Sequence, residues 1–394
     1  MLDFLNYQFS LPTLILAISA GTVLLFQLIY YIAVYGRMLS FFRKKKKHKY
    51  DDTVAEGMHQ GVSVVIVSNN SGDALKDGLL QILEQEYPLF EVLVVNENST
   101  DDTEFILYIL KENYPNLTVI NLGLNANKYE SFKFSSAIGI RSAKYPNVLL
   151  TDVNCMPKSY NWLSQMMNPV NNNRYKNIVT GICLREDSKG LSAALERYDQ
   201  AISYMNLISY TLCGNAYTSC GMNMIYNKDF LINNGGFISQ YTNSCNQEDY
   251  FVHRHSSKHN TALVVDEQAF LYLPSYRNFK TFFRVKFATS LSHKALAAKD
   301  KILLALNPVT SFLYYVFAAL LLILLFPWQY IVISLVIKWT VQIIYCKKCM
   351  AKLNIKKNWW AVPFMEIFFF FFNFIIRLKV LFYRKREKKI RWDK

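Results

Sequence analysis

An uncharged run near the amino terminus restricts this chain more than any other feature. Residues Leu11–Val34 carry no acidic or basic side chain. A helix of that length can cross the hydrocarbon core of a bilayer, which is about 30 Å thick. A secretory signal peptide is the alternative, but the run is long, no basic residue precedes it, and no clear small-residue cleavage site follows it. We therefore expect a retained membrane anchor.

Basic residues follow the anchor at once, at Arg37 and throughout the segment 43–49. Juxtamembrane charge of this kind stays on the cytoplasmic side, which predicts an outer amino terminus and an inner domain. The net charge of +15 lies largely in this run and in the segments 346–357 and 384–394. We interpret it as topology signals and contacts with anionic lipids, and we expect no nucleic-acid partner.

The seven cysteines indicate a reducing compartment. Their number is odd and their spacing is not that of a disulfide framework. Cys346 and Cys349 lack a second pair of ligands, so we do not expect zinc there.

Beyond residue 60 the chain alternates short β-branched runs with stretches of helical periodicity, which predicts a largely parallel sheet. The expected strands are Val62–Val67, Phe90–Val95, Leu117–Asn121 and Asn147–Thr151. The expected helices are Asp73–Glu86, Asp101–Asn113 and Ser131–Ala143. A second half should hold a strand at Ile178–Leu184, a helix from Leu191 to about Ile208 and a small-residue segment at Gly214–Gly221.

The carboxyl-terminal third contains further apolar segments. Residues 276–301 mix aromatic and basic side chains, as in a helix lying among lipid headgroups, although an ordinary amphipathic surface helix has the same pattern. Membrane spans are expected at Ile302–Phe326 and Trp328–Tyr345. Basic clusters flank Trp359–Ile376, and Pro363 and Glu366 lie within it, so we expect a re-entrant or interfacial hairpin there.

Acidic side chains follow several of the expected strands, where ligands bind in parallel sheets. Asp101 and Asp102 precede a helix, and we expect them to cap it. Asp152 closes an apolar strand and should face the ligand crevice, where it could bind Mg²⁺ or Mn²⁺. Asp249 is a candidate general base. The nearby histidines are expected to form a polar helix face and not a metal site: His253, His255 and His259.

Over about residues 55–300 the chain resembles glycosyltransferase family 2, in particular its membrane-bound bacterial members. The resemblance rests on the order and spacing of several segments. They are Val62–Val67, Gln85–Val92, Asn96–Asp101, Lys133–Ile140, Thr151–Pro157, Cys220–Tyr226, Gly235–Phe237 and Gln247–Asp249.

The resemblance implies a GT-A fold, which is an α/β Rossmann-like domain with a mostly parallel sheet, here flanked by transmembrane helices at both ends. It also implies a UDP- or GDP-linked sugar donor, a divalent ion, and inverting displacement with Asp249 as base beside Glu248. Asp152 and Asn154 occupy the positions of the metal-binding Asp-x-Asp motif. The donor-binding positions fall on Asn96, Glu97, Asn98, Lys133 and Asp152.

The sequence departs from the family pattern where Asn154 replaces the second Asp of that motif, and where Asn96, Glu97 and Asn98 replace Asp-Asp-Gly. A neutral amide oxygen is a weaker metal ligand than a carboxylate. A Gln and Arg motif of related membrane enzymes is also missing near residues 282–289.

We therefore expect a multi-pass protein of the bacterial inner membrane with a cytoplasmic glycosyltransferase domain. Its parts should be an anchor at 1–50, the transferase domain at 51–275, an interfacial helix at 276–301 and a membrane hairpin with a basic tail at 302–394. The acceptor should be lipid-linked or close to the membrane, in cell-envelope polysaccharide or glycolipid synthesis. A catalytically degenerate partner or scaffold is the second hypothesis, and a processive synthase ranks last because few crossings are evident.

Overall fold

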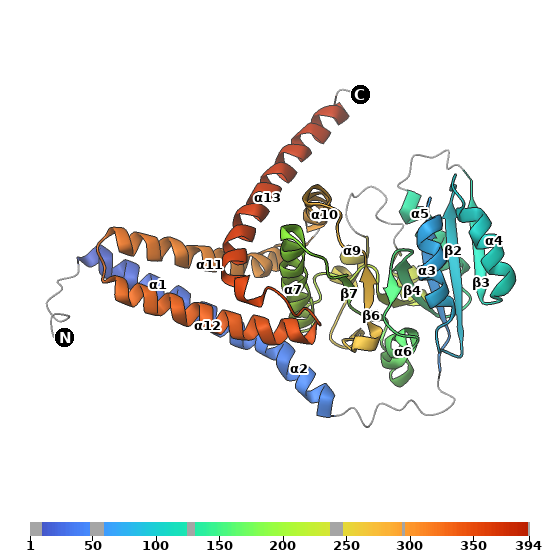
Figure 1. Ribbon diagram of the computed structural model, residues 1–394, viewed down its shortest axis with the longest axis horizontal. Helices are drawn as coiled ribbons and strands as arrows, with labels where there is room; N and C mark the ends of the chain where they lie inside the picture. The colour runs from blue at the N-terminus through green and yellow to red at the C-terminus, as the bar shows by residue number, and fades with distance from the viewer. Residues whose placement is uncertain (1–9, 48–58, 124–130, 237–246, 294–295, 393–394) are drawn as a thin grey trace. The chain divides into compact units, whose positions relative to one another are not determined.

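The computed structural model describes residues 10–47, 59–123, 131–236, 247–293 and 296–392. The chain divides into two compact units. One unit comprises Met1–Lys44, Ala194–Met205 and Ala297–Lys394, and the other comprises Lys45–Ala193 and Asn206–Leu296. Figure 1 shows the helices of the first unit and the mixed α/β elements of the second.

A seven-stranded sheet forms the centre of the α/β unit, in the order β3-β2-β1-β4-β8-β6-β9. The first four neighbours are parallel, and β8 pairs antiparallel with β4 and β6. Its strands are β1 (Val62–Ser68), β2 (Phe90–Glu97), β3 (Leu117–Leu122), β4 (Asn147–Asp152), β6 (Ile178–Thr180), β8 (Met224–Asn227) and β9 (Thr261–Leu263). A mostly parallel α/β sheet is what the alternating pattern predicts.

Helices cover both faces of this sheet. Apolar residues of α3 (Gly72–Leu83) and α4 (Thr103–Asn113) pack on one face, together with α6 (Trp162–Asn172). On the other face α5 (Ser131–Ser142) comes very close to the strands. A Cβ atom at Gly139 would lie 2.5 Å from Val65 Cγ1, so only glycine allows this approach. The burial of both faces explains why β1 and β2 are apolar without alternation.

One expected strand, Ile178–Leu184, is wrong as a single element. The segment forms β6 and then β7 (Cys183–Arg185), and these strands belong to different sheets. The chain breaks at Gly181, where a Cβ atom would lie 2.5 Å from Asn223 Nδ2. β7 joins β5 (Met156–Pro157) and β10 (Leu271–Leu273) in a small sheet.

The remaining helices of the α/β unit are short, with one exception. They are α8 (Lys228–Asn233), α9 (Gln247–His255) and α10 (Phe279–Ser292). The exception is α7 (Leu191–Leu212), whose middle part, Ala194–Met205, belongs to the helical unit while its two ends belong to the α/β unit. α7 extends four residues beyond the end that the sequence predicts.

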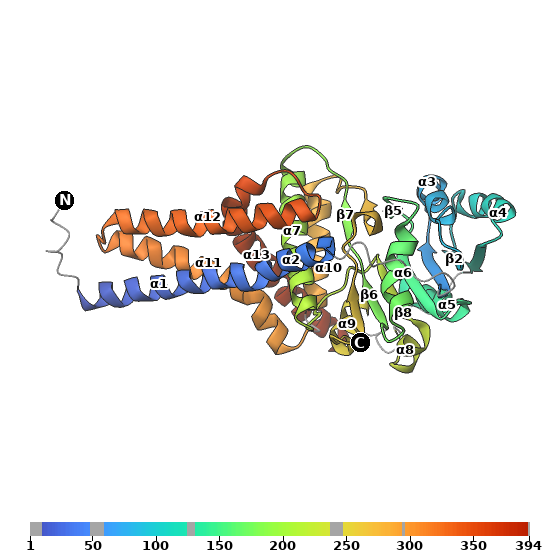
Figure 2. The ribbon, with the colours of Figure 1, turned by 90° about the horizontal axis from the view of Figure 1, so that it is seen from below.

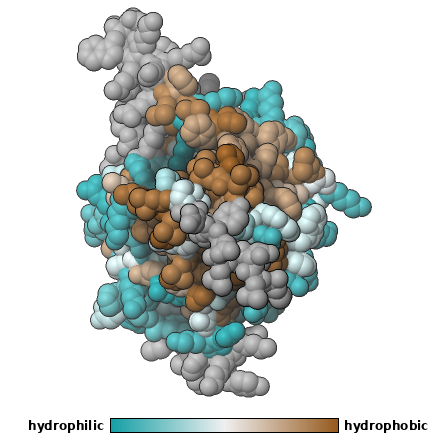
Figure 3. Space-filling model, turned by 90° about the vertical axis from the view of Figure 1, so that its left-hand side faces the viewer, coloured by the Kyte–Doolittle hydropathy of each residue, from teal (hydrophilic) through white to brown (hydrophobic). Residues whose placement is uncertain are grey.

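The helical unit contains four helices long and apolar enough to cross a membrane, within the described part of the chain. The amino-terminal one is continuous through α1 (Leu11–Tyr30), a π-helical segment (Tyr31–Tyr35) and α2 (Gly36–Lys47). The others are α11 (Ala298–Ile323), α12 (Trp328–Lys352) and α13 (Val362–Trp392). α1, α11 and α12 lie side by side (Figure 2). Figure 3 looks onto the end where α1 begins and α11 turns into α12, and the centre of this face is apolar.

The hairpin expected within Trp359–Ile376 is wrong. A single 3-10 turn at Trp359–Ala361 leads into α13, which continues without a break to residue 392. Pro363 is the second residue of α13, where a missing amide hydrogen costs nothing. Glu366 does not end the helix either, because it pairs with Lys338 of α12.

Candidate active site

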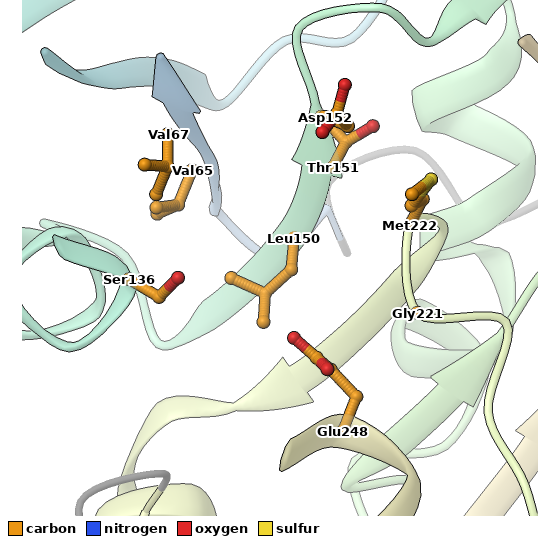
Figure 4. Close-up of a pocket in the computed structure, with 9 residues that line it drawn as sticks. All are labelled: Val65, Val67, Ser136, Leu150, Thr151, Asp152, Gly221, Met222 and Glu248. Carbon is orange, nitrogen blue, oxygen red and sulfur yellow. The ribbon is translucent and has the colours of Figure 1, made fainter. Parts of the chain in front are cut away.

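A pocket of about 140 Å³ opens at the carboxyl edge of the parallel strands. β1 and β4 supply its floor, α5 supplies one wall, and the segment before β8 and the start of α9 supply the others (Figure 4). Its lining residues are Val65, Val67, Ser136, Leu150, Thr151, Asp152, Gly221, Met222 and Glu248. This is the edge at which ligands bind in open parallel sheets.

Asp152 ends β4 and lines the pocket, as its place in the sequence suggests. Its Oδ1 accepts hydrogen bonds from the backbone N and the side-chain Nδ2 of Asn154, both at 2.9 Å. No described residue donates to Asp152 Oδ2. One oxygen of this carboxylate therefore fixes the turn after β4, and the other is available to a ligand.

The side chain of Asn154 is exposed and turns its nitrogen, rather than its oxygen, toward Asp152. An amide nitrogen cannot coordinate a cation, so these two residues form a turn in this arrangement and not a two-ligand metal site. Rotation of the amide by about half a turn would present the oxygen instead.

The three expected base-binding residues at the end of β2 lie in different environments. Asn96 is buried, with Oδ1 accepting from Ser99 Oγ at 2.6 Å and Nδ2 donating to Asn121 Oδ1 at 3.0 Å. Glu97 accepts a hydrogen bond from Ser135 Oγ of α5. Asn98 is exposed and has a positive φ of 43°. The structure brings Glu97 toward α5, whereas the Asn96 amide is occupied within the sheet.

Asp101 caps a helix, as predicted, and in addition ties two helices together. Its Oδ1 accepts from the amide of Thr103, the first residue of α4, and its Oδ2 accepts from the amide of Gly72, the first residue of α3, both at 3.1 Å. Hydrogen bonding from Thr103, with help from these amides, lowers the pKa of Asp101. Asp102 is the residue before α4 but makes no side-chain capping bond, so that part of the prediction is wrong.

Glu248 and Asp249 begin α9, where acidic side chains favour the positive end of the helix dipole. Glu248 lines the pocket and points its carboxylate toward Leu150 (Figure 4). Asp249 Oδ1 accepts from Thr218 Oγ1 at 2.8 Å, Ser219 N at 2.7 Å and Ser219 Oγ at 2.9 Å. Three donors on one oxygen hold this carboxylate in a single orientation.

Burial, with contributions from the negative charges of Glu248 and Asp249, raises the pKa values of two nearby tyrosines. Burial, followed by the charges of Glu248 and Asp249, raises the pKa of Tyr226 well above its usual value. Burial raises the pKa of Tyr217 in the same direction, with smaller contributions from Tyr210 and Asp249. Both phenols are therefore neutral at physiological pH.

Two residues singled out in the sequence fall outside the described side chains. Lys133 lies in α5 and Gln247 begins α9, but their side chains are not among those described. Among the described residues, no group of three or more His, Cys, Asp and Glu side chains could hold a metal ion. His255 packs on Phe251, with ring centroids 4.7 Å apart.

Sequence reasoning missed Ser136, Met222, Thr218 and Ser219 as site residues. Ser136 lies in α5 and its hydroxyl points into the pocket (Figure 4). Met222, Thr218 and Ser219 belong to the irregular segment before β8. The small residues of this segment are a signal present in the sequence, although they do not reveal which side chains face the site.

A divalent ion fits the donor set only in part. Asp152 Oδ2 is a hard oxygen at the pocket, which suits Mg²⁺ or Mn²⁺. A second protein ligand requires the Asn154 amide to rotate. The site therefore resembles those that hold Mg²⁺ through one or two protein oxygens, with water and phosphate oxygens completing the shell.

Comparison with known proteins agrees with this geometry. Residues 63–235 match the family model described as glycosyl transferase family 2, and this segment contains β1, β2, β4 and the segment before β8. The chain thus contains a glycosyltransferase family 2 segment. The family match ends before α9, so Glu248 and Asp249 lie outside it.

Curated relatives of this chain include poly-β-1,6-N-acetyl-D-glucosamine synthases. The Staphylococcus epidermidis protein is 29% identical over 130 residues, which are 32% of this chain and 30% of the relative. The protein from Staphylococcus aureus strain MSSA476 is 24% identical over 181 residues, which are 45% of this chain and 42% of the relative. The aligned segment thus spans less than half the length of either relative.

Among solved structures, the chain is similar to a mannosyltransferase from Pyrobaculum calidifontis in complex with GDP-Man and Mn²⁺. The TM-score is 0.50 at 15% sequence identity, and the alignment covers 86% of this chain and 100% of that one. At this identity the likeness concerns the fold alone. The expected GT-A fold, with a mostly parallel sheet and long apolar helices at both ends of the chain, is confirmed.

Proposed function

We propose that this protein is an inverting transferase that moves a sugar from a UDP- or GDP-linked donor to a lipid-linked or membrane-proximal acceptor. The synthesis of a cell-envelope polysaccharide or glycolipid is the proposed context. The observation that carries the proposal is the pair of carboxylates in one pocket, where Asp152 at the end of β4 faces the pocket that Glu248 enters from α9.

Asp152 is proposed to hold the diphosphate end of the donor. A divalent cation bound at its Oδ2 would neutralise the charge that develops on the leaving nucleoside diphosphate. The turn that Asn154 closes on Asp152 Oδ1 keeps the carboxylate at the end of β4 without using its second oxygen. Glu97, Asn98 and Lys133 are proposed to contact the nucleotide from the neighbouring strand and from α5.

Asp249 is proposed as the general base. The acceptor hydroxyl must lose its proton as it attacks the anomeric carbon, so a fixed carboxylate near that hydroxyl is required. Thr218 and Ser219 orient the Asp249 carboxylate through their hydrogen bonds to Oδ1. Glu248, which enters the pocket, is proposed to bind and orient hydroxyl groups of the transferred sugar.

The bacterial inner membrane is the proposed location, with the α/β unit in the cytoplasm. Four long apolar helices support membrane insertion. The basic segment 43–49, which follows the first of them, supports an inner position for the α/β unit. Anionic lipids are the proposed counterparts of the basic residues beside the helices.

A degenerate family member that serves as a partner or scaffold of an envelope-synthesis enzyme is the second candidate. Two observations favour it. The Asn154 nitrogen occupies the place of a second metal-binding oxygen, and both polar atoms of the Asn96 amide are bonded within the protein. The availability of Asp152 Oδ2 and the fixed orientation of Asp249 favour the enzyme.

Nucleotide release separates the two candidates. The purified full chain in detergent would be supplied with a panel of UDP- and GDP-sugars and either Mg²⁺ or Mn²⁺, beside the variants Asp152→Ala and Asp249→Asn. The proposal predicts release from one donor class, with a loss of at least 100-fold in both variants. Donor binding without release, and with equal background in all three proteins, would support the scaffold instead.

A further inference from the structure

A charged pair lies buried among the apolar helices. Lys338 Nζ of α12 donates to Glu366 Oε2 of α13 at 2.8 Å, and the two side chains are 1% and 8% exposed. Lys338 Nζ also donates to Tyr315 OH of α11 at 3.1 Å. Because either charge alone would be costly in this environment, the pair fixes α13 against α12 and α11 at this level.

Aromatic contacts on each side of the pair show the direction of α13. Phe364 packs on Trp339 of α12 with ring centroids 6.0 Å apart, and Phe370 stacks on Phe312 of α11 at 4.0 Å. Six residues of α-helix rise by about 9 Å. Two packed helices lie roughly 8–10 Å apart. The rise between Phe364 and Phe370 is therefore about equal to the distance between α12 and α11, so α13 passes from one to the other over these six residues.

Phe312 and Trp339 lie at similar levels of the antiparallel pair α11 and α12. Tyr314 OH of α11 meets Ser334 Oγ of α12 at 2.6 Å. Phe312 lies two residues from Tyr314 along α11, and Trp339 lies five residues from Ser334 along α12. Both displacements point away from the turn that joins the two helices. The levels thus differ by about 4–5 Å. α13 accordingly runs across the axes of α11 and α12 instead of along them, as Figure 1 shows.

One side of α13 presents an uninterrupted apolar stripe. Its members are spaced by four and three residues in turn and are all exposed: Phe364, Phe368, Phe371, Ile375, Leu378 and Phe382. The opposite side, which includes Phe369, Phe372 and Ile376, is buried. Lys379 is exposed beside the stripe, between Ile375 and Phe382, and a long side chain of this type can keep its charge in water while its stem covers apolar surface.

Basic residues stand at both ends of α13. Lys347 of α12 lies over the ring of Trp359, just before α13, at 4.3 Å. The segment 384–394 carries seven Lys and Arg residues against two acidic ones. A crossing by α13 would place these two basic groups on opposite sides of the membrane, against the preference of such charge for the cytoplasm.

We infer that α13 is an interfacial helix of the cytoplasmic leaflet and not a further crossing. Lipid acyl chains cover its apolar stripe, and the Lys338–Glu366 pair fastens it to α12. α13 packs on α12 at Trp339, which is eight residues before the basic Lys347, or about 12 Å along the helix. This depth below the basic residues is similar to the roughly 5–10 Å that is typical of interfacial helices. The inference rests on the proposed placement of α1, α11 and α12 as membrane spans.

Cysteine labelling of the full chain tests this inference. Single substitutions Lys356→Cys before α13, Phe371→Cys in the stripe and Ile390→Cys in the basic tail would be treated with a membrane-impermeant maleimide, in intact cells and in inverted membrane vesicles. The wild-type chain supplies the background from its own cysteines. We expect positions 356 and 390 to react only in vesicles, and position 371 to react there at least tenfold more slowly than position 356.

Two outcomes would overturn the inference. Labelling of position 390 from outside intact cells would make α13 a crossing, and labelling of position 371 at the rate of position 356 would place the stripe in water. The readout does not depend on sugar transfer, so it is separate from the outcome for the proposed activity.

The role of the ion pair has its own test on the Phe371→Cys background. Lys338→Met leaves Glu366 buried without its partner, and we expect labelling at 371 to rise at least threefold as α13 loosens. The double variant Lys338→Met/Glu366→Met removes both charges and should return labelling to within twofold of the parent. Unchanged labelling in Lys338→Met would contradict the fastening role.

Discussion

Asn154 donates its side-chain nitrogen to Asp152 Oδ1 at 2.9 Å, in the place where a second metal-binding carboxylate is expected in the family. The bond closes the turn after β4 and leaves Asp152 Oδ2 as the oxygen offered to the pocket. The proposed cation site therefore rests mainly on one carboxylate.

The first prediction concerns Asn154→Asp. A second carboxylate supplies a hard anionic oxygen in place of the amide nitrogen, so Mn²⁺ affinity in the presence of nucleoside diphosphate should rise about tenfold, or about 1.4 kcal/mol. Calorimetric titration of the purified chain with Mn²⁺ measures the change. Asn154→Ala is the matched control and should not tighten binding. Equal affinity in wild type and Asn154→Asp would mean that the turn after β4 does not bind the cation.

The second prediction compares Asp249→Asn with Glu248→Gln, two changes that preserve side-chain shape. If Asp249 is the base, Asp249→Asn lowers kcat by about 10²–10⁴-fold with little change in KM for the donor. Glu248→Gln should mainly raise KM, because Glu248 lines the pocket. Steady-state kinetics with the preferred donor distinguishes them. A larger fall of kcat in Glu248→Gln would transfer the role of base to Glu248.

The third prediction concerns the pH dependence of stability at Asp101. Hydrogen bonding lowers its pKa in the folded state. Its stabilisation is therefore present above the unfolded-state value of about 3.9 and is lost as pH falls through the lower folded-state pKa. Asp101→Ala should cost about 1 kcal/mol at pH 7, the usual value of a capping side chain.

Denaturant unfolding of the full chain in detergent, followed by circular dichroism at pH 7 and near pH 3, measures this loss. The gap between wild type and Asp101→Ala should narrow at the lower pH. Asp102→Ala is the control and should fall within about 0.5 kcal/mol of wild type at both values, as for an ordinary surface change. A gap that widened near pH 3 would contradict the capping account.

The fourth prediction concerns Asn223, a buried amide behind the pocket. It accepts from Trp162 Nε1 at 3.1 Å and donates to the carbonyl oxygens of Ile182 and Ala269, both at 2.9 Å. Asn223→Ala leaves these three buried groups without that partner. The Ile182 carbonyl oxygen keeps its hydrogen bond from Leu271 N. Trp162 Nε1 and the Ala269 carbonyl oxygen lose this partner, and since each such group costs about 1–3 kcal/mol, we expect a loss of at least about 2 kcal/mol.

The same denaturant assay measures the Asn223 effect. The exposed Asn233→Ala on α8 serves as the control and should change the unfolding free energy by less than about 0.5 kcal/mol. A similarly small effect of Asn223→Ala would show that the three groups find other partners.

The sequence predicted the first four strands to within two residues because their apolar, β-branched runs end at polar turns, and β1, β2 and β4 are buried on both faces. It also placed Asp152 and Glu248 at one edge of the sheet. The break at Gly181 depends on the distant Asn223 side chain, which local periodicity cannot reveal. The continuity of α13 through Glu366 also depends on a residue distant in the sequence. A charged residue argues against a continuous apolar helix, and its ion pair with Lys338 is visible only in the structure.

Side-chain orientation was the least predictable property of the site. The sequence offers Asn96 as a nucleotide contact and Asn154 as a metal ligand. Both amides instead form hydrogen bonds within the protein, with Ser99 and Asn121 in one case and with Asp152 in the other. Such pairings depend on rotamers and on neighbouring strands, and neither is encoded in residue spacing.

Transfer of label from a nucleotide sugar to an acceptor at the membrane measures the proposed activity of this chain. Inverted membrane vesicles containing the wild-type chain or Asp249→Asn would be incubated with labelled UDP- and GDP-sugars and Mn²⁺, and the label would be followed into the lipid and polymer fractions. The proposed function predicts label in one of these fractions with wild type and a reduction of at least 100-fold with Asp249→Asn. Equal incorporation with both proteins, or none from any donor, would contradict it.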